Sequence, residues 1–226
     1  MPANNGTPIN IEKYKRYYEE HRTKAIISLI PSLAPKSTSL DIGCGPGWFT
    51  KILHGQGWDV TALDANPHNI TTAAPYAVTT HTGNALEIMS AMKPDSYNLA
   101  CALEIIEHMD KNAGKELLRS IYTILKPKGS LLISTPNTFS PIGFIGRVIN
   151  ERLLRKGTWN AWDTTHVHIY QSFEFIELLK TSGFIIDRVI GYWYEISLAW
   201  KMPFLTFNTF PLNRFGFNII VRCHKP

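Results

Sequence analysis

Cysteine is scarce in this chain, and long hydrophobic runs are missing from it. A disulfide framework or a cysteine-based zinc site needs paired or closely spaced cysteines, whereas this chain has three scattered ones, Cys44, Cys101 and Cys223. No apolar run approaches the roughly 20 residues that span a bilayer. Asn, Lys and Glu interrupt the N-terminal segment, so no secretory signal is visible there. We therefore expect a cytoplasmic protein with reduced thiols.

A strong excess of charge of one sign is also absent. Lysine and arginine number 23 against 18 aspartate and glutamate residues, which gives a formal net charge of +5. Most of this excess lies after residue 137, and no basic stripe alternates with aromatic residues as in nucleic-acid modules. With 44% hydrophobic and 18% charged residues, the composition is that of a globular protein. We expect no nucleic-acid partner.

The order of apolar patterns predicts a single α/β domain over residues 1–226. Up to residue 135, short β-rich runs alternate with helical patterns, which is typical of a parallel sheet with helices on both faces. A helix at 11–30 precedes this region, in an N-terminal cap over residues 8–34. We expect strands at 39–42, 59–63, 77–81, 97–102 and 130–134, and helices at 46–56, 67–74, 85–92 and 112–125.

The pattern changes after Pro136. We expect an amphipathic helix at 141–156 and an aromatic loop at 157–170, which together form a lid over residues 138–171. A helix at 172–181, with Ser172 as its N-cap, ends before Gly183. Two more strands follow, at 184–191 and 217–223, with a stretch rich in Phe and Pro between them.

A glycine-rich turn after the first strand is the strongest site signal. The run Asp41-Ile42-Gly43-Cys44-Gly45-Pro46-Gly47 places glycines at alternate positions, where the missing Cβ lets backbone N–H groups approach a ligand. Asp64 ends the second strand and can accept hydrogen bonds from a ribose diol. This spacing fits a NAD site or an S-adenosylmethionine (SAM) site. SAM is favoured because Asp41 would repel a pyrophosphate but suits a cationic amino acid, and because the third glycine of G-x-G-x-x-G is missing.

Five motifs in sequence order give the chain its resemblance to a known family. They are L-D-I-G-C-G-P-G at 40–47, A-L-D at 62–64, G-N-A at 83–85, Y-N-L-A-C-A-L-E-I-I-E-H-M at 97–109 and L-K-P-K-G-S-L-L-I-S-T-P-N at 125–137. Together they resemble a class I SAM-dependent methyltransferase. E-x-x-E-H at 104–108 and the later Thr165-His166 are similar to the small-molecule O-methyltransferases of ubiquinone biosynthesis. The Trp-rich segment 157–163 departs from that subfamily and is more like methyltransferases of sugars, glycans or envelope lipids.

The resemblance implies a Rossmann-like, doubly wound sheet of seven strands in the order 3-2-1-4-5-7-6, with strand 7 antiparallel. SAM would lie across the carboxyl ends of strands 1, 2 and 4. The glycines would admit its methionine part and ribose, Asp64 would bind its ribose hydroxyls, and Asn84, where the family often has Asp, would border its adenine. The expected cofactor-binding residues are Asp41, Gly43, Gly45, Gly47, Asp64, Asn84, Ala85 and Leu103.

A hydroxyl acceptor needs a base, and histidine, with an ordinary pKa of about 6.5, suits that task. We expect His166, His108 and Glu104 to be catalytic, with His166 favoured as the base because it lies in the lid that faces the acceptor. The alternatives are that His108 buttresses its loop and that His166 anchors the lid, with His168 as a rival or partner of His166. We expect no metal; the alternative is Mg²⁺ held by Glu104, Glu107 and His108.

These observations predict a SAM-dependent methyltransferase that methylates a hydroxyl group of a small molecule, which is quinone-like, a lipid, or a sugar or natural product. The alternatives are a SAM-binding protein without catalysis and a NAD-dependent oxidoreductase, which the glycine spacing disfavours. The helix at 141–156 is basic, with Arg147, Arg152, Arg155 and Lys156 against Glu151. It either contacts the inner face of an anionic membrane peripherally or covers the acceptor pocket. We expect a monomer or a homodimer.

Overall fold

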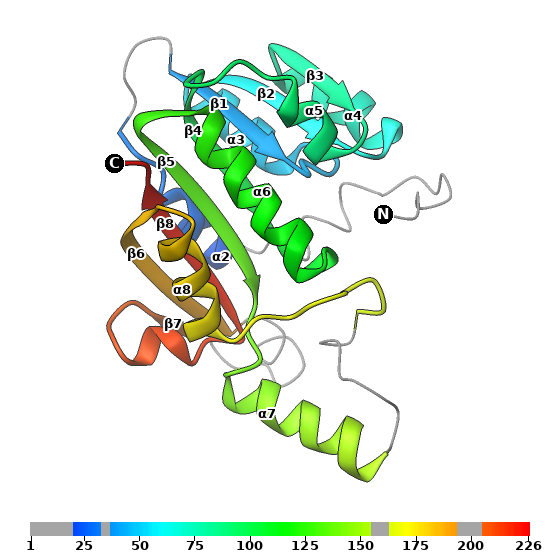
Figure 1. Ribbon diagram of the computed structural model, residues 1–226, viewed down its shortest axis with the longest axis vertical. Helices are drawn as coiled ribbons and strands as arrows, with labels where there is room; N and C mark the ends of the chain where they lie inside the picture. The colour runs from blue at the N-terminus through cyan, green and yellow to red at the C-terminus, as the bar shows by residue number, and fades with distance from the viewer. Residues whose placement is uncertain (1–19, 33–36, 155–162, 194–204) are drawn as a thin grey trace.

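A mixed β-sheet with helices on both faces forms the body of the protein (Figure 1). The computed structural model describes residues 20–32, 37–154, 163–193 and 205–226. The strand order is β3-β2-β1-β4-β5-β8-β6-β7. The strands are β1 (Thr38–Ile42), β2 (Asp59–Asp64), β3 (Thr79–Thr82), β4 (Tyr97–Leu103), β5 (Leu125–Pro136), β6 (Ile185–Trp193), β7 (Leu205–Phe207) and β8 (Asn218–His224).

The predicted order and direction of the strands are confirmed. β1 pairs in parallel with β2 and β4, β2 with β3, and β4 with β5. β8, which is the seventh predicted strand, runs antiparallel to both β5 and β6. The sequence did not predict β7, a three-residue strand that pairs antiparallel with the end of β6. It lies in the stretch rich in Phe and Pro, where no alternating pattern marks a strand.

Helices cover both faces of the sheet because neighbouring side chains of a strand point to opposite faces. The helices are α2 (Glu20–Ile27), α3 (Trp48–Gly55), α4 (Pro67–Ala73), α5 (Ala85–Ser90), α6 (Lys111–Ile124), α7 (Pro141–Arg147) and α8 (Ser172–Thr181). In β5, Leu131 and Ile133 belong to the core under α5, α6 and α8, whereas Leu132 belongs to the core under α2 and α3. All three side chains are fully buried.

Some predicted boundaries differ from the structure. The helix expected at 141–156 consists of α7 followed by a π-helical segment, η3 (Val148–Leu153). β5 begins at Leu125, earlier than expected, directly after α6. The N-terminal helix is described only as α2, and the remainder of the expected helix at 11–30 lies largely outside the described residues, as do residues 155–162 of the lid.

The prediction that Ser172 caps α8 is wrong. Gln171 occupies the N-cap position without a side-chain capping bond, and Ser172 is the first helical residue. The Ser172 N–H instead donates to Oδ1 of Asn137, 2.8 Å away. A side chain at the end of β5 therefore caps this helix.

Asn137 is a buried junction between four segments. Its Oδ1 accepts from the N–H of Phe139 as well as that of Ser172, at 3.0 and 2.8 Å. Its Nδ2 donates to the carbonyl oxygens of Arg214 and Gly216, at 2.8 and 2.7 Å. One amide thus fixes the end of β5, the entrance to α7, the start of α8 and the approach to β8.

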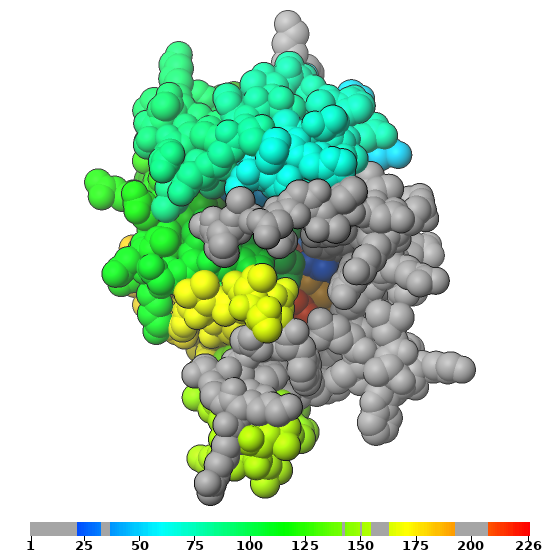
Figure 2. Space-filling model, turned by 90° about the vertical axis from the view of Figure 1, so that its right-hand side faces the viewer, coloured from blue at the N-terminus to red at the C-terminus, as the bar shows by residue number. Residues whose placement is uncertain are grey.

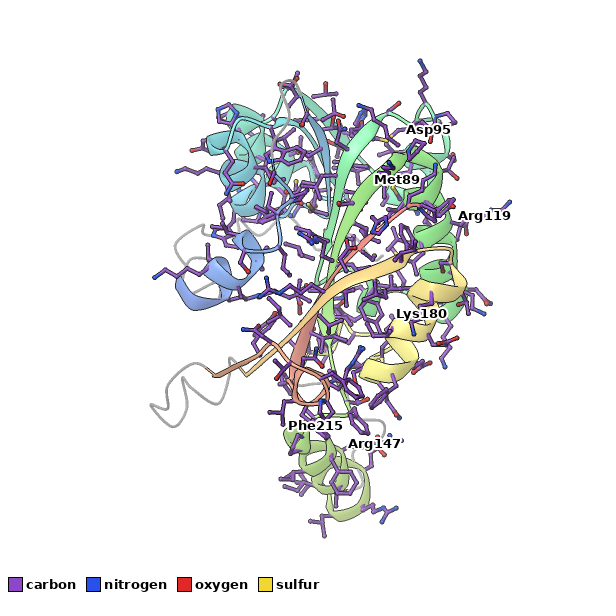
Figure 3. The ribbon with its side chains drawn as sticks, turned by 90° about the vertical axis from the view of Figure 1, so that its left-hand side faces the viewer. Met89, Asp95, Arg119, Arg147, Lys180 and Phe215 are labelled. Atoms are coloured by element: carbon purple, nitrogen blue, oxygen red, sulfur yellow. The ribbon has the colours of Figure 1, made fainter. Side chains whose placement is uncertain are left out.

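α7 and η3 form an arm that projects beyond the end of the sheet (Figure 1). Phe139, at its base, packs its ring against Phe173 and Phe215, with centroids 5.0 and 5.4 Å apart. Figure 3 shows Phe215 close to this base and Arg147 on the arm itself. In the described part of the chain, none of the helices combines the length and the apolar character that crossing a membrane requires.

Candidate active site

The glycine loop, residues 43–47, joins β1 to α3 at the carboxyl edge of the sheet. Gly43, Gly45 and Gly47 have φ values of 66°, 53° and 85°, in the left-handed region that favours glycine. A Cβ at Gly47 would lie 2.6 Å from the Cα of Ala73, and one at Gly43 would lie 2.7 Å from Cδ1 of Ile105. Close packing against the backbone of Ala73 therefore requires glycine at Gly47, a reason that the sequence did not give, whereas at Gly43 the Ile105 side chain could move aside.

Asp64 connects the end of β2 to the glycine loop. Its Oδ2 accepts from the Gly45 N–H at 2.9 Å, while Oδ1 accepts from the Asn66 N–H at 2.8 Å and from Nδ2 of Asn69 at 3.0 Å. These bonds aim the carboxylate along the carboxyl edge; they use both lone pairs of Oδ1 and leave one on Oδ2. Sequence reasoning missed Asn69, whose position on α4, five residues after Asp64, was the available signal.

Asp41 lies at the end of β1 with only 2% of its surface exposed. Thr50 Oγ1 donates a hydrogen bond to its Oδ2 at 2.7 Å. Burial raises the pKa of Asp41 from 3.8 to about 7; the nearby Asp64 adds to the increase, and the Thr50 hydrogen bond opposes it. A positively charged ligand at this edge would favour the carboxylate form.

The remaining predicted cofactor residues also lie at this edge. Asn84 caps α5, because its Oδ1 accepts from the Leu86 N–H at 2.9 Å, and Ala85 is the first residue of that helix. Leu103 is the last residue of β4 and pairs with Ser134. The residues fit SAM: left-handed glycines open the backbone, one carboxylate faces the edge from β2, and a buried acid suits a cationic amino acid.

Glu104 directly follows β4 in a left-handed conformation, with φ of 55°. Its Oε1 accepts from Oγ of Ser134 at 2.6 Å and lies 3.2 Å from Nη2 of Arg22. Its Oε2 accepts from Nδ2 of Asn218 at 3.1 Å. The predicted catalytic carboxylate is thus engaged by β5, α2 and β8, an arrangement that suits positioning of the loop after β4.

Glu107 is fully buried, and its carboxylate lies near Thr135 and Arg22, which oppose the effect of burial on its pKa. Burial raises the pKa of Glu107 well above its usual value, and the nearby Glu104 adds to the increase. Its backbone oxygen accepts from the N–H groups of Val167 and His168, at 2.8 and 3.0 Å. These two bonds hold segment 163–168 against the loop after β4, and Figure 2 shows that segment in yellow beside green residues at the surface.

This contact brings His108 and His166 together, with ring centroids 5.0 Å apart. Among the described residues, Glu107, His108 and His166 form a group whose potential ligand atoms all lie within 4.8 Å, so these three could hold a metal ion. The alternative from the sequence named Glu104 in place of His166. His168 instead lies against α8, with Nε2 3.6 Å from Oε1 of Glu174.

Asp163 lies beside both histidines. Its Oδ1 accepts from the N–H and the hydroxyl of Thr165, at 2.8 and 2.6 Å, and its Oδ2 lies 3.9 Å from Nε2 of His166. Partial burial works to raise the pKa of Asp163, but the hydrogen bonds from Thr165 and the nearby histidines lower it below its usual value. Sequence reasoning singled out neither Asp163 nor the role of Thr165.

Comparison with known proteins agrees with this geometry. A family model described as a methyltransferase domain matches residues 14–189. Proteins named ubiquinone biosynthesis O-methyltransferase are similar in sequence. That of Rickettsia canadensis is 30% identical over 72% of this chain and 69% of its own length. That of Rickettsia bellii is 31% identical over 70% of this chain and 65% of its own length. Two solved structures of SAM-dependent methyltransferases are similar in fold. That from Thermotoga maritima has a TM-score of 0.68 at 18% identity and covers 96% of each chain. That from Archaeoglobus fulgidus has a TM-score of 0.67 at 20% identity and covers 96% of this chain and all of its own.

A doubly wound sheet with this strand order, and with a glycine loop and acids at its carboxyl edge, defines a class I SAM-dependent methyltransferase. The chain belongs to the methyltransferase domain family. It is an enzyme, and SAM is its methyl donor.

Proposed function

We propose that this enzyme methylates a hydroxyl group of a small, quinone-like aromatic acceptor. The observation that carries the proposal is the pair of histidines beside the carboxyl edge of β4, since an aryl hydroxyl must lose its proton as its oxygen is methylated. The names of the similar proteins from Rickettsia support an O-methylation. Lipid and sugar-like hydroxyls are the other acceptors to be tested, by mass spectrometry of products formed from SAM and a panel of phenols, catechols, hydroxylated lipids and sugars.

The chain's own residues have distinct tasks in this proposal. Asp64 binds the ribose hydroxyls, the glycine loop admits the methionine part, and Asn84 and Ala85 border the adenine. Leu103 brings the backbone end of β4 to the same place. Bound SAM supplies an electrophilic methyl group, and alignment of the acceptor oxygen with it can contribute up to about 7–11 kcal/mol of the rate acceleration. A SAM-binding protein without catalysis is not favoured, because the loop, the acids and the histidines are all in place.

Cofactor affinity is expected to depend on Asp64. Asp64→Ala should weaken SAM binding by about 1–3 kcal/mol, because hydrogen bonds to a charged acceptor are lost and the Gly45 N–H loses its partner. Calorimetry with SAM and S-adenosylhomocysteine measures the change. Asp59→Ala, at the exposed opposite end of β2, is the matched control and should leave affinity unchanged. Equal affinities for SAM in the two variants would contradict the assignment.

The affinity for SAM is also expected to rise between pH 6 and 7. Because the pKa of Asp41 is raised to about 7, the ligand-free protein holds a proton there at pH 6. A cationic ligand favours the carboxylate, so binding releases this proton and is stronger once it has gone. Calorimetry in buffers of different ionisation enthalpy counts the released protons.

The stability of the ligand-free protein should depend on pH in the opposite direction to the affinity for SAM. A carboxyl group whose pKa is higher in the folded state favours folding at low pH, and this contribution is lost as the pH rises from about 4 to about 7. Asp41→Asn should flatten both pH profiles relative to Asp59→Asn. Proton release that persists unchanged in Asp41→Asn would mean that another group titrates.

The arm formed by α7 and η3 is proposed to contact an anionic membrane. Its apolar side chains are exposed, with 66% of Phe144, 54% of Ile145 and 72% of Leu153 accessible. Arg147 and Arg152 lie on the same arm, whereas Arg155 and Lys156, also named from the sequence, lie outside the described residues. Exposed apolar groups beside basic ones are typical of peripheral membrane contact.

Sedimentation with vesicles tests the arm. Binding should increase with the fraction of anionic lipid and decrease with salt, since each basic residue near such a surface contributes about 1 kcal/mol. Arg147→Glu with Arg152→Glu should abolish most of it. The control reverses Lys115 and Arg119, an equal charge change on α6. Equal, negligible binding to neutral and anionic vesicles would leave the arm as a lid only.

A further inference from the structure

A short chain of hydrogen bonds runs from Asp163 through Thr165 to His108. The Thr165 hydroxyl donates to Oδ1 of Asp163 at 2.6 Å, and the Thr165 N–H donates to the same oxygen at 2.8 Å. Nδ1 of His108 lies 3.1 Å from Oγ1 of Thr165 and 3.2 Å from its backbone oxygen. His108 and Thr165 are 57 residues apart in the sequence, so only the fold brings them together.

These contacts determine which nitrogen of His108 carries the proton. A backbone oxygen can only accept a hydrogen bond, and the single proton of the Thr165 hydroxyl is already donated to Asp163. Nδ1 of His108 must therefore be the donor to both oxygens of Thr165. In a neutral imidazole the other nitrogen, Nε2, then keeps a free lone pair.

We propose that Asp163 and Thr165 are positioning residues that hold His108 with its proton on Nδ1, so that Nε2 can take the proton of the acceptor hydroxyl. This inference rests on the proposed O-methylation and assigns its base. Thr165 acts directly on His108, and Asp163 acts through Thr165 by fixing the direction of its hydroxyl. An oriented imidazole loses less freedom when it accepts the proton, as in sites where a third group orients the base.

His166 approaches the same carboxylate at a longer distance. Its Nε2 lies 3.9 Å from Oδ2 of Asp163, too far for a hydrogen bond. The charged and titratable groups facing His108 in this region are Asp163, His166 and the buried Glu107. The preference for His166 that follows from the sequence is untested, and the hydrogen bonds favour His108.

The proton and electron balance of the step is simple. The acceptor oxygen forms a bond to the methyl carbon while the bond from that carbon to sulfur breaks and its electron pair stays on sulfur. The acceptor hydroxyl proton passes to Nε2 of His108, and the resulting imidazolium returns it to water. The products are the methyl ether, S-adenosylhomocysteine and one proton.

The first readout is independent of activity. Long-range ¹⁵N–¹H spectra of the histidine-labelled full chain, taken well above the ordinary histidine pKa of about 6.5, distinguish a protonated Nδ1 from a protonated Nε2. The missing signals in His108→Gln assign those of His108. We expect the wild type to show the proton on Nδ1. Thr165→Val loses the hydroxyl but keeps the backbone oxygen, so it should show a mixture in which the Nε2 form has increased, and Thr165→Ser should resemble the wild type.

The second readout is turnover with catechol as the probe acceptor. Thr165→Val and Asp163→Ala should lower kcat about 10- to 100-fold, the range found for groups that orient metal-bound histidines and taken here as a guide, with unchanged SAM affinity. Thr165→Ser should retain most of the wild-type kcat. Thr164→Val, the same change at the exposed neighbouring residue, is the matched control and should be neutral.

Two outcomes overturn the inference. One is a wild-type His108 that carries its proton on Nε2; the other is a Thr165→Val variant in which neither the tautomer nor kcat changes. Failure of the proposed function is a different result. A wild-type enzyme that methylates no hydroxyl acceptor contradicts O-methylation, while the spectra still decide whether Thr165 and Asp163 fix the tautomer.

Discussion

Alanine in place of His108 is expected to lower kcat about 10²- to 10⁴-fold, the range for loss of a general base, while the affinity for SAM stays nearly unchanged. The reason is that the imidazole takes the acceptor proton and has no direct part in holding the cofactor, whose predicted contacts lie on β1, the glycine loop, β2, the start of α5 and the end of β4. Steady-state turnover with catechol gives kcat, and calorimetry gives the SAM affinity. A change confined to the chemical step should lower kcat and kcat/KM together.

His166→Ala is the comparison that decides between the two histidines. We expect a smaller loss, since the contacts with Thr165 hold the proton of His108 on Nδ1 and leave its Nε2 for the acceptor proton. A loss of the larger size in His166→Ala alone would make His166 the base, as its place in the lid predicts. Activity that is lost with EDTA and regained with Mg²⁺ would instead assign Glu107, His108 and His166 to a metal ion.

Asn137→Ala is expected to have the largest effect on stability. It removes four side-chain hydrogen bonds and leaves the N–H groups of Phe139 and Ser172 and two backbone oxygens without this partner in the interior. Each buried polar group left in this way costs about 1–3 kcal/mol, and partial relaxation brings the expected total to about 4–5 kcal/mol, at the upper end for a single substitution. Thermal and urea unfolding both measure it.

Two further variants test the explanation. Asn137→Asp keeps the acceptor for Phe139 and Ser172 but loses the donor to the oxygens of Arg214 and Gly216, so it should also destabilise the fold. Asn112→Ala, at an exposed position in the first turn of α6, should change stability by no more than about 0.5 kcal/mol. Equal effects of Asn137→Ala and Asn112→Ala would show that the junction contributes nothing.

The sequence predicts those parts of the molecule whose signals are local. Alternating apolar patterns identify the strands, and the order of the strands in the sheet follows from the family that the motifs resemble. Asp64 is identifiable because its position at the end of β2 and its distance from the glycine loop are both readable along the chain. The left-handed glycines are also local, although the close contact of Gly47 with Ala73 needs the packing of α4.

Contacts between distant segments could not be predicted in this way. Glu104 reads as a catalytic acid in its motif, yet its partner Asn218 is 114 residues away. The bond from His108 to Thr165 likewise spans 57 residues and depends on the backbone of Glu107 holding the lid segment in place. Ser172 matches the preference for a helix cap, but the competing amide of Asn137 becomes visible only when the chain is folded.

The position of β8 between β5 and β6 sets an order of events during synthesis on the ribosome. The parallel strands β1 to β5 are complete once residue 136 has emerged, but β5 keeps an open edge until β8 pairs with it along seven positions. β6 is synthesised before β8, so the edge of β6 that pairs with β8 also stays unpaired until then. Unpaired edges with buried-type side chains such as Leu132 and Ile190 are prone to aggregate. Nascent chains stalled before residue 218 should therefore depend on chaperones far more than released ones.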